Sequence, residues 1–397
     1  MFPNIPKEVD VVIVGIGPAG SAVAKICAEA GISVLGLEKK QEIGMFKRCG
    51  EGLSKSSLER MGIDLDPRFI SNEIAGLTVY APNKTFLRLD FPDKEGWIVE
   101  RKVFDKILAY DAAKAGAKII AKANVKSVKR NNGKVDVVVE FNGEEFDVSA
   151  KLVVACDGVE SKTGREMGLD TKLNLIDVCS CAQFEMANID IDDKRIELFF
   201  GNKIGPGGYV WIFPKGRNEA NVGIGVRRKF TEKSAYDHLK EFVESHDGLK
   251  KGSIIEVNTG AVPVGGIMDN MVEDNIILAG DAAHQVNPVH GGGIAEAYVG
   301  GKIAGEVAIE AIKKNDFSKK ALSGYNEKWL EARGKKLKKL VKLRELLENM
   351  SDDDLNWIVD YLKGEDLVEF SKGKSFGKLA KILIKKPKLL KFAKSLI

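Results

Sequence analysis

The sequence VDVVIVGIGPAG, at residues 9–20, restricts the possible folds of this chain more than any other stretch. Its first part is a short run of β-branched apolar residues, as in a strand that is covered on both faces. Gly15, Gly17 and Gly20 follow with the spacing G-x-G-x-x-G, which permits a tight turn, a close backbone approach to a pyrophosphate, and close packing of helix on strand. A helix over residues 18–30 would point its N-terminus, which favours negative charge, at the phosphates. The stretch therefore predicts a dinucleotide-binding unit.

The residue at the end of the next predicted strand indicates which dinucleotide is bound. Residues 33–37 form this strand, and Glu38 follows at the position where a carboxylate binds the ribose 2′-hydroxyl group. A carboxylate there disfavours a 2′-phosphate. FAD or NAD is therefore favoured over NADP.

The charge of the chain is unevenly distributed. The 397 residues include 61 basic and 57 acidic residues, but residues 372–397 contain nine lysines and no acidic residue. The rest of the chain is therefore net acidic, which argues against a nucleic-acid partner.

The cysteines and the hydropathy exclude further classes. Five widely spaced cysteines suggest no disulfide framework and favour a reducing, cytoplasmic compartment. Cys179 and Cys181 lack a matching second pair, so no metal site is expected. The first strand begins too early for a signal peptide, and no apolar run reaches the roughly 18 residues of a membrane span.

Alternating apolar patterns and Asn-Gly turns predict many strands. Strands are expected at 76–80, 86–91, 118–121, 125–129, 135–141, 145–148, 152–156, 195–200, 209–213, 221–226 and 275–279. Asn-Gly pairs at 132–133 and 142–143 indicate hairpins. From 177 to 226 the period is near two, as in an antiparallel sheet with one apolar face.

These elements suggest a divided α/β architecture, in which a Rossmann-like dinucleotide fold is interrupted by an antiparallel-sheet substrate domain and followed by helices. The expected parts are residues 1–75, 101–172 and 271–315 for the dinucleotide domain, 76–100 and 173–270 for the substrate domain, and 316–397 for the helical C-terminus.

Two further segments carry groups that suit a flavin. NIILAGDAAH, at residues 275–284, ends a predicted strand in Gly280 and Asp281, whose carboxylate would accept hydrogen bonds from cofactor hydroxyl groups. The glycines at 291–293 open a helix, so their N–H groups can approach a planar ring and stabilise negative charge.

Together with Asp157-Gly158, these motifs resemble the glutathione-reductase-type FAD proteins of the p-hydroxybenzoate hydroxylase superfamily. RCGEGL at 48–53 and PGGYVWIFP at 206–214 further resemble the geranylgeranyl reductase family, and the likeness extends from residue 9 to about residue 309. The resemblance implies bound FAD and the reduction of isoprenoid double bonds in archaeal-type ether lipid precursors.

The resemblance also assigns site residues. It implies that the cofactor is bound by Gly15, Gly17, Ala19, Gly20, Glu38, Cys49, Gly50, Gly52, Arg101, Val125, Asp281, Gly293 and Ile294. Cys49 is additionally a candidate catalytic residue, or else a buried cysteine without a chemical role. Tyr209, Trp211 and Phe213 are expected in the wall of a substrate cavity, or simply in sheet packing. His284 and His290 are loop histidines, and His290 is a candidate for handling a proton.

The reaction would take a hydride equivalent from reduced flavin and a proton from an unidentified donor. Its electrons would come from an external donor, namely a ferredoxin, a deazaflavin or a nicotinamide. A flavin monooxygenase acting on an aromatic or polyketide substrate, and an electron-transfer flavoprotein, are the alternatives. Arg165 falls later than in the monooxygenase pattern.

The lysine-rich tail suggests contact with an anionic membrane. Phe376, Leu379 and Leu383 have helical spacing, and Pro387 must interrupt the helix. The apolar stripe either packs on the body or lies on lipid, and the second alternative predicts a protein peripherally associated with the inner face of the cell membrane.

Overall fold

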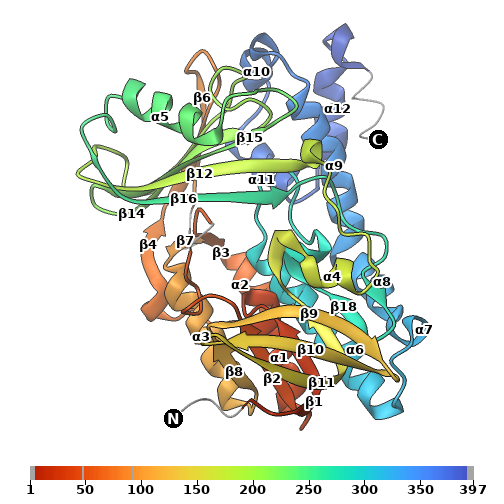
Figure 1. The fold of residues 1–397 in the computed structure, drawn as a ribbon. Helices are drawn as coiled ribbons and strands as arrows, with labels where there is room; N and C mark the ends of the chain where they lie inside the picture. Colours follow the sequence, from red (N-terminus) through yellow and green to blue (C-terminus); the bar gives the residue numbers. More distant parts are fainter. Residues whose placement is uncertain (1–4, 47–48, 92, 94, 391–397) are drawn as a thin grey trace.

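The computed structural model describes residues 5–46, 49–91, 93 and 95–390. It contains three sheets. The lower half in Figure 1 holds an eight-stranded sheet whose central order is β17-β18-β11-β1-β2-β8, with β10 beside β11 and β9 beside β10. Its strands are β1 (Glu8–Val14), β2 (Val34–Glu38), β8 (Lys118–Ala121), β9 (Ala123–Asn131), β10 (Lys134–Phe141), β11 (Glu144–Ala155), β17 (Val272–Glu273) and β18 (Ile276–Leu278).

The upper half holds a seven-stranded sheet in the order β16-β12-β15-β14-β13-β5-β6. Its neighbours are antiparallel except for β13 and β5, which run parallel. A three-stranded sheet, β3-β7-β4, lies between the two larger sheets. The strands of these two sheets are β3 (Gly52–Ser54), β4 (Ile70–Ile74), β5 (Gly76–Tyr80), β6 (Phe86–Asp90), β7 (Gly96–Val99), β12 (Val178–Ala187), β13 (Arg195–Phe199), β14 (Tyr209–Gly216), β15 (Glu219–Arg227) and β16 (Ser253–Pro263).

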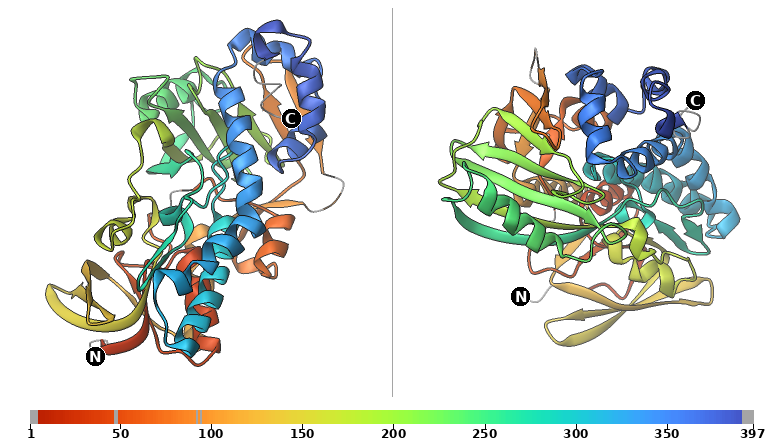
Figure 2. Two further views of the ribbon diagram at one scale, coloured as in Figure 1. Left: turned by 90° about the vertical axis from the view of Figure 1, so that its right-hand side faces the viewer. Right: turned by 90° about the horizontal axis from the view of Figure 1, so that it is seen from above.

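Helices cover the eight-stranded sheet and flank the upper one. α1 packs between α3 and α6, and α5 packs on β12 and β15. The C-terminal helices climb one side of the molecule from the lower sheet to the upper one (Figure 2). The helices are α1 (Pro18–Glu29), α2 (Lys55–Met61), α3 (Arg101–Lys114), α4 (Lys162–Glu166), α5 (Ala235–Ser245), α6 (Ile294–Lys314), α7 (Lys319–Leu322), α8 (Gly324–Trp329), the π-helical segment η5 (Leu330–Gly334), α9 (Lys335–Glu348), α10 (Asp352–Val359), α11 (Gly364–Ser371) and α12 (Phe376–Leu383).

Short 3₁₀ turns complete the connections. They are η1 (Pro67–Phe69), η2 (Gly158–Glu160), η3 (Leu175–Asp177), η4 (Gly280–Ala283) and η6 (Pro387–Leu389).

The mixed α/β fold with a helical C-terminus agrees with the sequence prediction. Both Asn-Gly hairpins are confirmed, because Asn132, Gly133, Asn142 and Gly143 all have the positive φ that a type I′ turn requires. One prediction was wrong: residues 145–148 and 152–156 are not separate strands. They form the single strand β11, whose first part pairs with β10 and whose end pairs with β1 and β18.

Candidate active site

A cavity of about 1150 Å³ runs between the two large sheets and the C-terminal helices. Every site residue expected from the sequence borders it except Gly20. One end is formed by the glycine turn after β1, the middle by the loop at residues 49–52, and the other end by apolar side chains of the upper sheet and the C-terminal helices.

The three glycines of the turn have different surroundings. Gly15 has a φ of +92°, and a Cβ atom there would lie 2.4 Å from the carbonyl oxygen of Cys156. A Cβ atom on Gly20 would lie 2.0 Å from the carbonyl oxygen of Gly15, so Gly20 lets α1 pack close to the turn. A Cβ atom on Gly17 would meet nothing within 4 Å. Gly17 therefore leaves a cradle beside the N-terminus of α1, where a phosphate would be stabilised.

The Glu38 side chain is held at the edge of this cradle. It is buried, and its two carboxylate oxygens accept hydrogen bonds from the backbone N–H groups of Ile16 at 3.1 Å and Lys40 at 3.0 Å. Ala19 and Val125 border the cavity nearby. These bonds fix the carboxylate where ribose hydroxyl groups can reach it.

The loop at residues 49–52 lies against the upper sheet. Cβ atoms built on Gly50 and Gly52 would each lie 2.9 Å from the Phe213 ring, so only glycine lets the loop approach β14 this closely. Arg48, which precedes the loop in the motif, lies outside the described residues.

Glu51 anchors the loop, although the sequence analysis assigned it no role. Its side chain is completely buried and accepts hydrogen bonds from the Arg101 backbone N–H at 2.8 Å and from Asn221 Nδ2 at 2.7 Å. It also lies 3.3 Å from Lys215 Nζ, which pairs with Glu100 and Glu185 as well. Burial opposes the charge of Lys215, but these carboxylates outweigh burial and raise its pKa above the ordinary value.

Cys49 faces a permanently charged neighbour. Its Sγ atom accepts a hydrogen bond from the Glu51 backbone N–H at 3.2 Å. Burial works against the charge of Arg101, but Asp105, at 3.0 Å, and Cys49 outweigh burial and raise the pKa of Arg101 above its usual range. The Arg101 guanidinium group therefore lies next to the Cys49 thiol.

The second strand–turn segment supplies the facing wall. Burial raises the pKa of Asp281 to about 6, with Arg101 opposing this effect. A Cβ atom on Gly293 would lie 3.2 Å from an Asp281 carboxylate oxygen. Ile294, the first residue of α6, also borders the cavity, so the helix N-terminus faces it.

His290 borders the cavity on the loop that precedes α6, and its role in handling a proton stays a prediction. Its Nδ1 atom accepts a hydrogen bond from the Gly292 backbone N–H at 3.1 Å. His284 lies outside the cavity lining, and burial lowers its pKa.

Alternation along β14 places three aromatic side chains on the cavity wall. Val210 and Ile212 point into the core under α5, while Tyr209, Trp211 and Phe213 border the cavity. The Trp211 Nε1–H donates to Gln183 Oε1 at 3.0 Å, and Gln183 Nε2 donates to the Cys49 carbonyl at 3.0 Å. Hydrogen bonds through Gln183 therefore connect the aromatic wall to the loop that contains Cys49.

The remainder of this end is apolar and comes from distant parts of the chain. It includes Leu77, Val79, Leu87, Leu89, Ile196, Leu198, Leu343, Leu346, Leu347, Leu355, Ile358, Leu362, Phe370 and Leu379. No motif in the sequence predicted that the C-terminal helices contribute to the site. The leucines at 337, 340, 343 and 346–347 were the available signal, because their spacing gives α9 an apolar stripe.

The apolar stripe of the tail follows the first of its two expected alternatives and packs on the body. Leu379, Ile382 and Leu383 of α12 are buried among the core residues. The interruption at Pro387 is confirmed, because α12 ends at Leu383 and η6 begins at Pro387. The tail beyond residue 390 lies outside the described residues.

The described residues contain neither a cluster of metal ligands nor a membrane-spanning helix. No three His, Cys, Asp or Glu side chains there are grouped as metal ligands would be. No helix in that part of the chain has the length and apolar character needed to cross a bilayer.

Comparison with known proteins shows strong likenesses. The family model described as "geranylgeranyl reductase catalytic domain" matches residues 177–262. The digeranylgeranylglycerophospholipid reductase of Methanocaldococcus jannaschii is 42% identical over 396 residues, which cover 98% of each chain. Among solved structures, a geranylgeranyl bacteriochlorophyll reductase-like protein from Thermoplasma acidophilum matches with a TM-score of 0.90 and 37% identity, covering 98% of this chain and 100% of that one.

A solved structure of lower sequence identity is similar to this chain in fold alone. A halogenase in complex with FAD matches with a TM-score of 0.69 and 15% identity, covering 98% of this chain and 94% of that one.

Proposed function

The chain belongs to the family of the digeranylgeranylglycerophospholipid reductases, and on this premise we propose that FAD and an isoprenoid ether lipid bind end to end in its long cavity. It is a flavin-dependent oxidoreductase that reduces carbon–carbon double bonds of geranylgeranyl groups in archaeal lipid synthesis. The observation that supports the proposal most is the continuity of the cavity from the glycine turn to the apolar wall.

The residues at the first end fit FAD. The cradle at Gly17 suits the pyrophosphate, and the fixed carboxylate of Glu38 suits the ribose. Asp157 supports the fit, because its buried Oδ1 atom has no hydrogen-bond partner among the described residues. We infer that the eight-stranded sheet carries the flavin and the seven-stranded sheet carries the substrate.

When bound, reduced flavin supplies a hydride from its N5 atom. The residues of the chain then orient the alkene and keep water away. The rings of Tyr209, Trp211 and Phe213 and the leucines of α9 offer an apolar path for an isoprenoid chain. The loop at residues 49–52 closes this path on the flavin side.

We propose that the Cys49 Sγ atom holds the proton that the alkene receives. A thiol that gives up its proton becomes a thiolate, and Arg101 is placed to stabilise that charge. Cys49→Ala should retain FAD and lower reduction by about 10²–10⁴-fold, the usual range for loss of an acid catalyst. Cys49→Ser is the matched variant, since a hydroxyl keeps the size of the group but is a weaker acid. Full activity in Cys49→Ala would show that the thiol has no chemical role.

The reaction is tested directly by anaerobic turnover. Protein with chemically reduced flavin is incubated with a digeranylgeranyl glycerol ether phosphate, and mass spectrometry follows the gain of two hydrogens per double bond. FAD released by denaturation should equal one per chain. A product that gains oxygen would instead indicate a monooxygenase.

The physiological electron donor is external in this proposal. Ferredoxin, a reduced deazaflavin and a nicotinamide are the candidates, and the bleaching rate of the flavin with each one distinguishes them. A donor that reduces the flavin only after lipid is added would indicate that substrate binding precedes reduction.

We also propose that charge alone holds the protein reversibly on anionic membranes. Lys374 and Lys381 are exposed, and a basic residue near such a surface contributes about 1 kcal/mol. Replacing both with glutamine should reduce co-sedimentation with anionic liposomes at low salt. Equal binding to neutral liposomes would contradict the proposal.

A further inference from the structure

One part of the cavity wall is strongly basic. Arg60 of α2, Arg333 of η5, Lys336 of α9 and Lys372 after α11 all border the cavity, and we call them the basic cluster. They come from separate parts of the chain, and no sequence motif predicted them.

The side chains of the cluster are close enough to interact. Arg333 forms an ion pair with Glu296 through two hydrogen bonds, one of them 2.7 Å long, and Arg60 lies 3.9 Å from Glu296. Burial first, and then Arg333, Arg60 and Lys372, lower the pKa of Lys336 to about 8, with Glu296 opposing. Arg60, Arg333 and Lys336 thus lie around the Glu296 carboxylate, and Lys372 lies close to Lys336.

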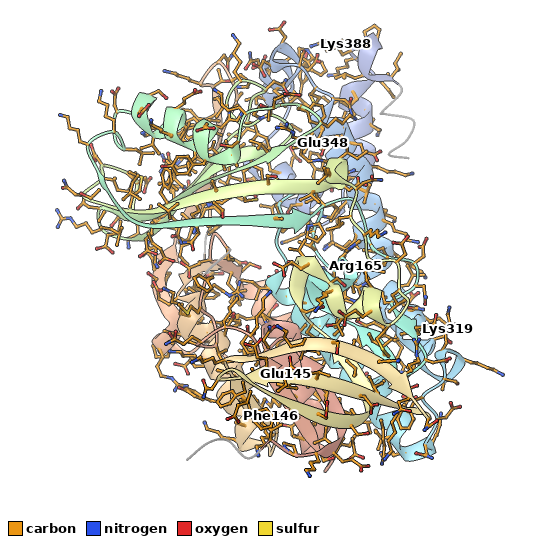
Figure 3. The ribbon with its side chains drawn as sticks, in the orientation of Figure 1. Glu145, Phe146, Arg165, Lys319, Glu348 and Lys388 are labelled. Atoms are coloured by element: carbon orange, nitrogen blue, oxygen red, sulfur yellow. The ribbon has the colours of Figure 1, made fainter. Side chains whose placement is uncertain are left out.

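The basic cluster has fewer neighbouring carboxylates than a second group of cations in the same cavity. A second pair of arginines, Arg227 and Arg344, borders the cavity near the upper sheet, where both lie beside Glu348, which is labelled in Figure 3. Asp177 lies 3.9 Å from Arg227, and Glu345 lies 3.6 Å from Arg344. Among the described residues, the arginines near the upper sheet contact three carboxylates, whereas the four cations of the basic cluster form ion pairs with one carboxylate, that of Glu296.

Arg60 Nε is buried without a hydrogen-bond partner in the described part of the chain, as are the Nε atoms of Arg227 and Arg344 near the upper sheet. The two groups therefore differ in their balance of charge and not in their unpaired donors. Lys372 is exposed and borders the cavity, so the cluster lies where the cavity meets solvent. Apolar residues such as Leu343 and Phe370 border the same cavity on the neighbouring helices. An anionic group here could continue into an apolar chain.

We propose that the basic cluster binds the phosphate of the substrate, while the isoprenoid chains occupy the apolar wall. This inference rests on the proposed function, and it names the class of ligand as a phosphate ester that carries an isoprenoid chain. Arginine and lysine together suit a doubly charged phosphate, because the guanidinium group donates two parallel hydrogen bonds and the ammonium group adds a point charge. The source of the phosphate is either a glycerol ether phosphate or a prenyl diphosphate.

The test compares ligands with and without phosphate on the FAD-loaded protein. Binding of digeranylgeranyl glycerol ether phosphate, the same ether without phosphate, geranylgeranyl diphosphate and geranylgeraniol is measured by quenching of tryptophan fluorescence. Lys336→Met, which retains an apolar stem, should weaken the phosphate-bearing ligands by about tenfold and leave the neutral ones unchanged. The stronger of the two phosphate ligands identifies the source.

Two variants serve as controls. Lys336→Arg should restore most of the affinity for phosphate, because the charge returns. Lys335→Met removes the neighbouring lysine, which is exposed and pairs with Glu331, and should change nothing. Equal weakening of charged and neutral ligands in Lys336→Met, or no weakening at all, would overturn the phosphate site.

Failure of the proposed reaction is distinguishable from failure of the site. Binding without turnover in the wild-type protein would refute the reductase function and leave the site intact. Turnover of the phosphate and neutral ethers with the same KM would retain the function and refute the site.

Discussion

The end of the cavity at the glycine turn, which we propose holds the flavin and call the flavin end, is formed by short contiguous motifs. The apolar end, which we propose holds the lipid and call the lipid end, is formed by side chains from separate strands and helices. The turn at residues 15–20 needs glycine for two backbone contacts that any Cβ atom would block. The lipid end needs only apolar side chains of suitable size, such as Trp211, Leu346 and Ile358. The flavin end is therefore specified by residue identity, and the lipid end by packing.

The largest loss of stability is expected from a substitution at Lys215, whose side chain links the loop at residues 49–52 to the seven-stranded sheet. Lys215→Met should lower the free energy of unfolding by about 3–5 kcal/mol, because Glu51 is left buried without its cation. Urea unfolding measures this loss. The double variant with Glu51→Gln should recover part of it, and a double variant no more stable than Lys215→Met would contradict the pairing.

A core leucine of the lipid end tests packing without touching the flavin. Leu346→Ala should lower the free energy of unfolding by about 2–5 kcal/mol, because the side chain is buried, and should leave FAD affinity unchanged. Thermal unfolding and FAD titration are measured on the same preparation. Leu390→Ala, at an exposed position, is the control. Lost FAD affinity in Leu346→Ala would show that the two ends are not independent.

A substitution at Glu38 tests the flavin end of the cavity. Glu38→Ala should weaken FAD binding by about 1.5–3 kcal/mol, since the ribose loses a charged acceptor and the Ile16 N–H loses its partner. Equilibrium dialysis of FAD gives the affinity. Glu38→Gln keeps an oxygen acceptor and should lie between the wild type and the alanine variant. Unchanged affinity in both would rule out the ribose contact.

The smallest effect is expected for the hydrogen bond that links the two ends. Trp211→Phe removes the donor to Gln183 and should cost about 1 kcal/mol, seen as a modestly raised KM for the lipid. Gln183→Leu removes the same bond from the other side. Effects that add in the double variant would show that the two residues do not act through this bond.

The difference between contacts that are local in sequence and contacts that are distant explains which features could be predicted from the sequence. The β1–α1–β2 unit and both Asn-Gly hairpins depend on neighbouring residues, so local patterns were sufficient. Glu51, Lys215 and the basic cluster depend on contacts between residues far apart in the chain, which no local pattern encodes. The tail was ambiguous because burial, and not periodicity, decides whether an apolar stripe faces protein or lipid.

The strand order of the lower sheet has a consequence for synthesis of the chain. β1 lies between β2 and β11, and β11 in turn pairs with β18, which ends at Leu278. In a nascent chain, β1 therefore waits for β11, and the far edge of β11 stays open until β18 has been made at residue 278. Contacts so distant in sequence slow folding and leave strand edges open to wrong partners. Chaperones or an early-bound cofactor would be most useful to this protein in that interval.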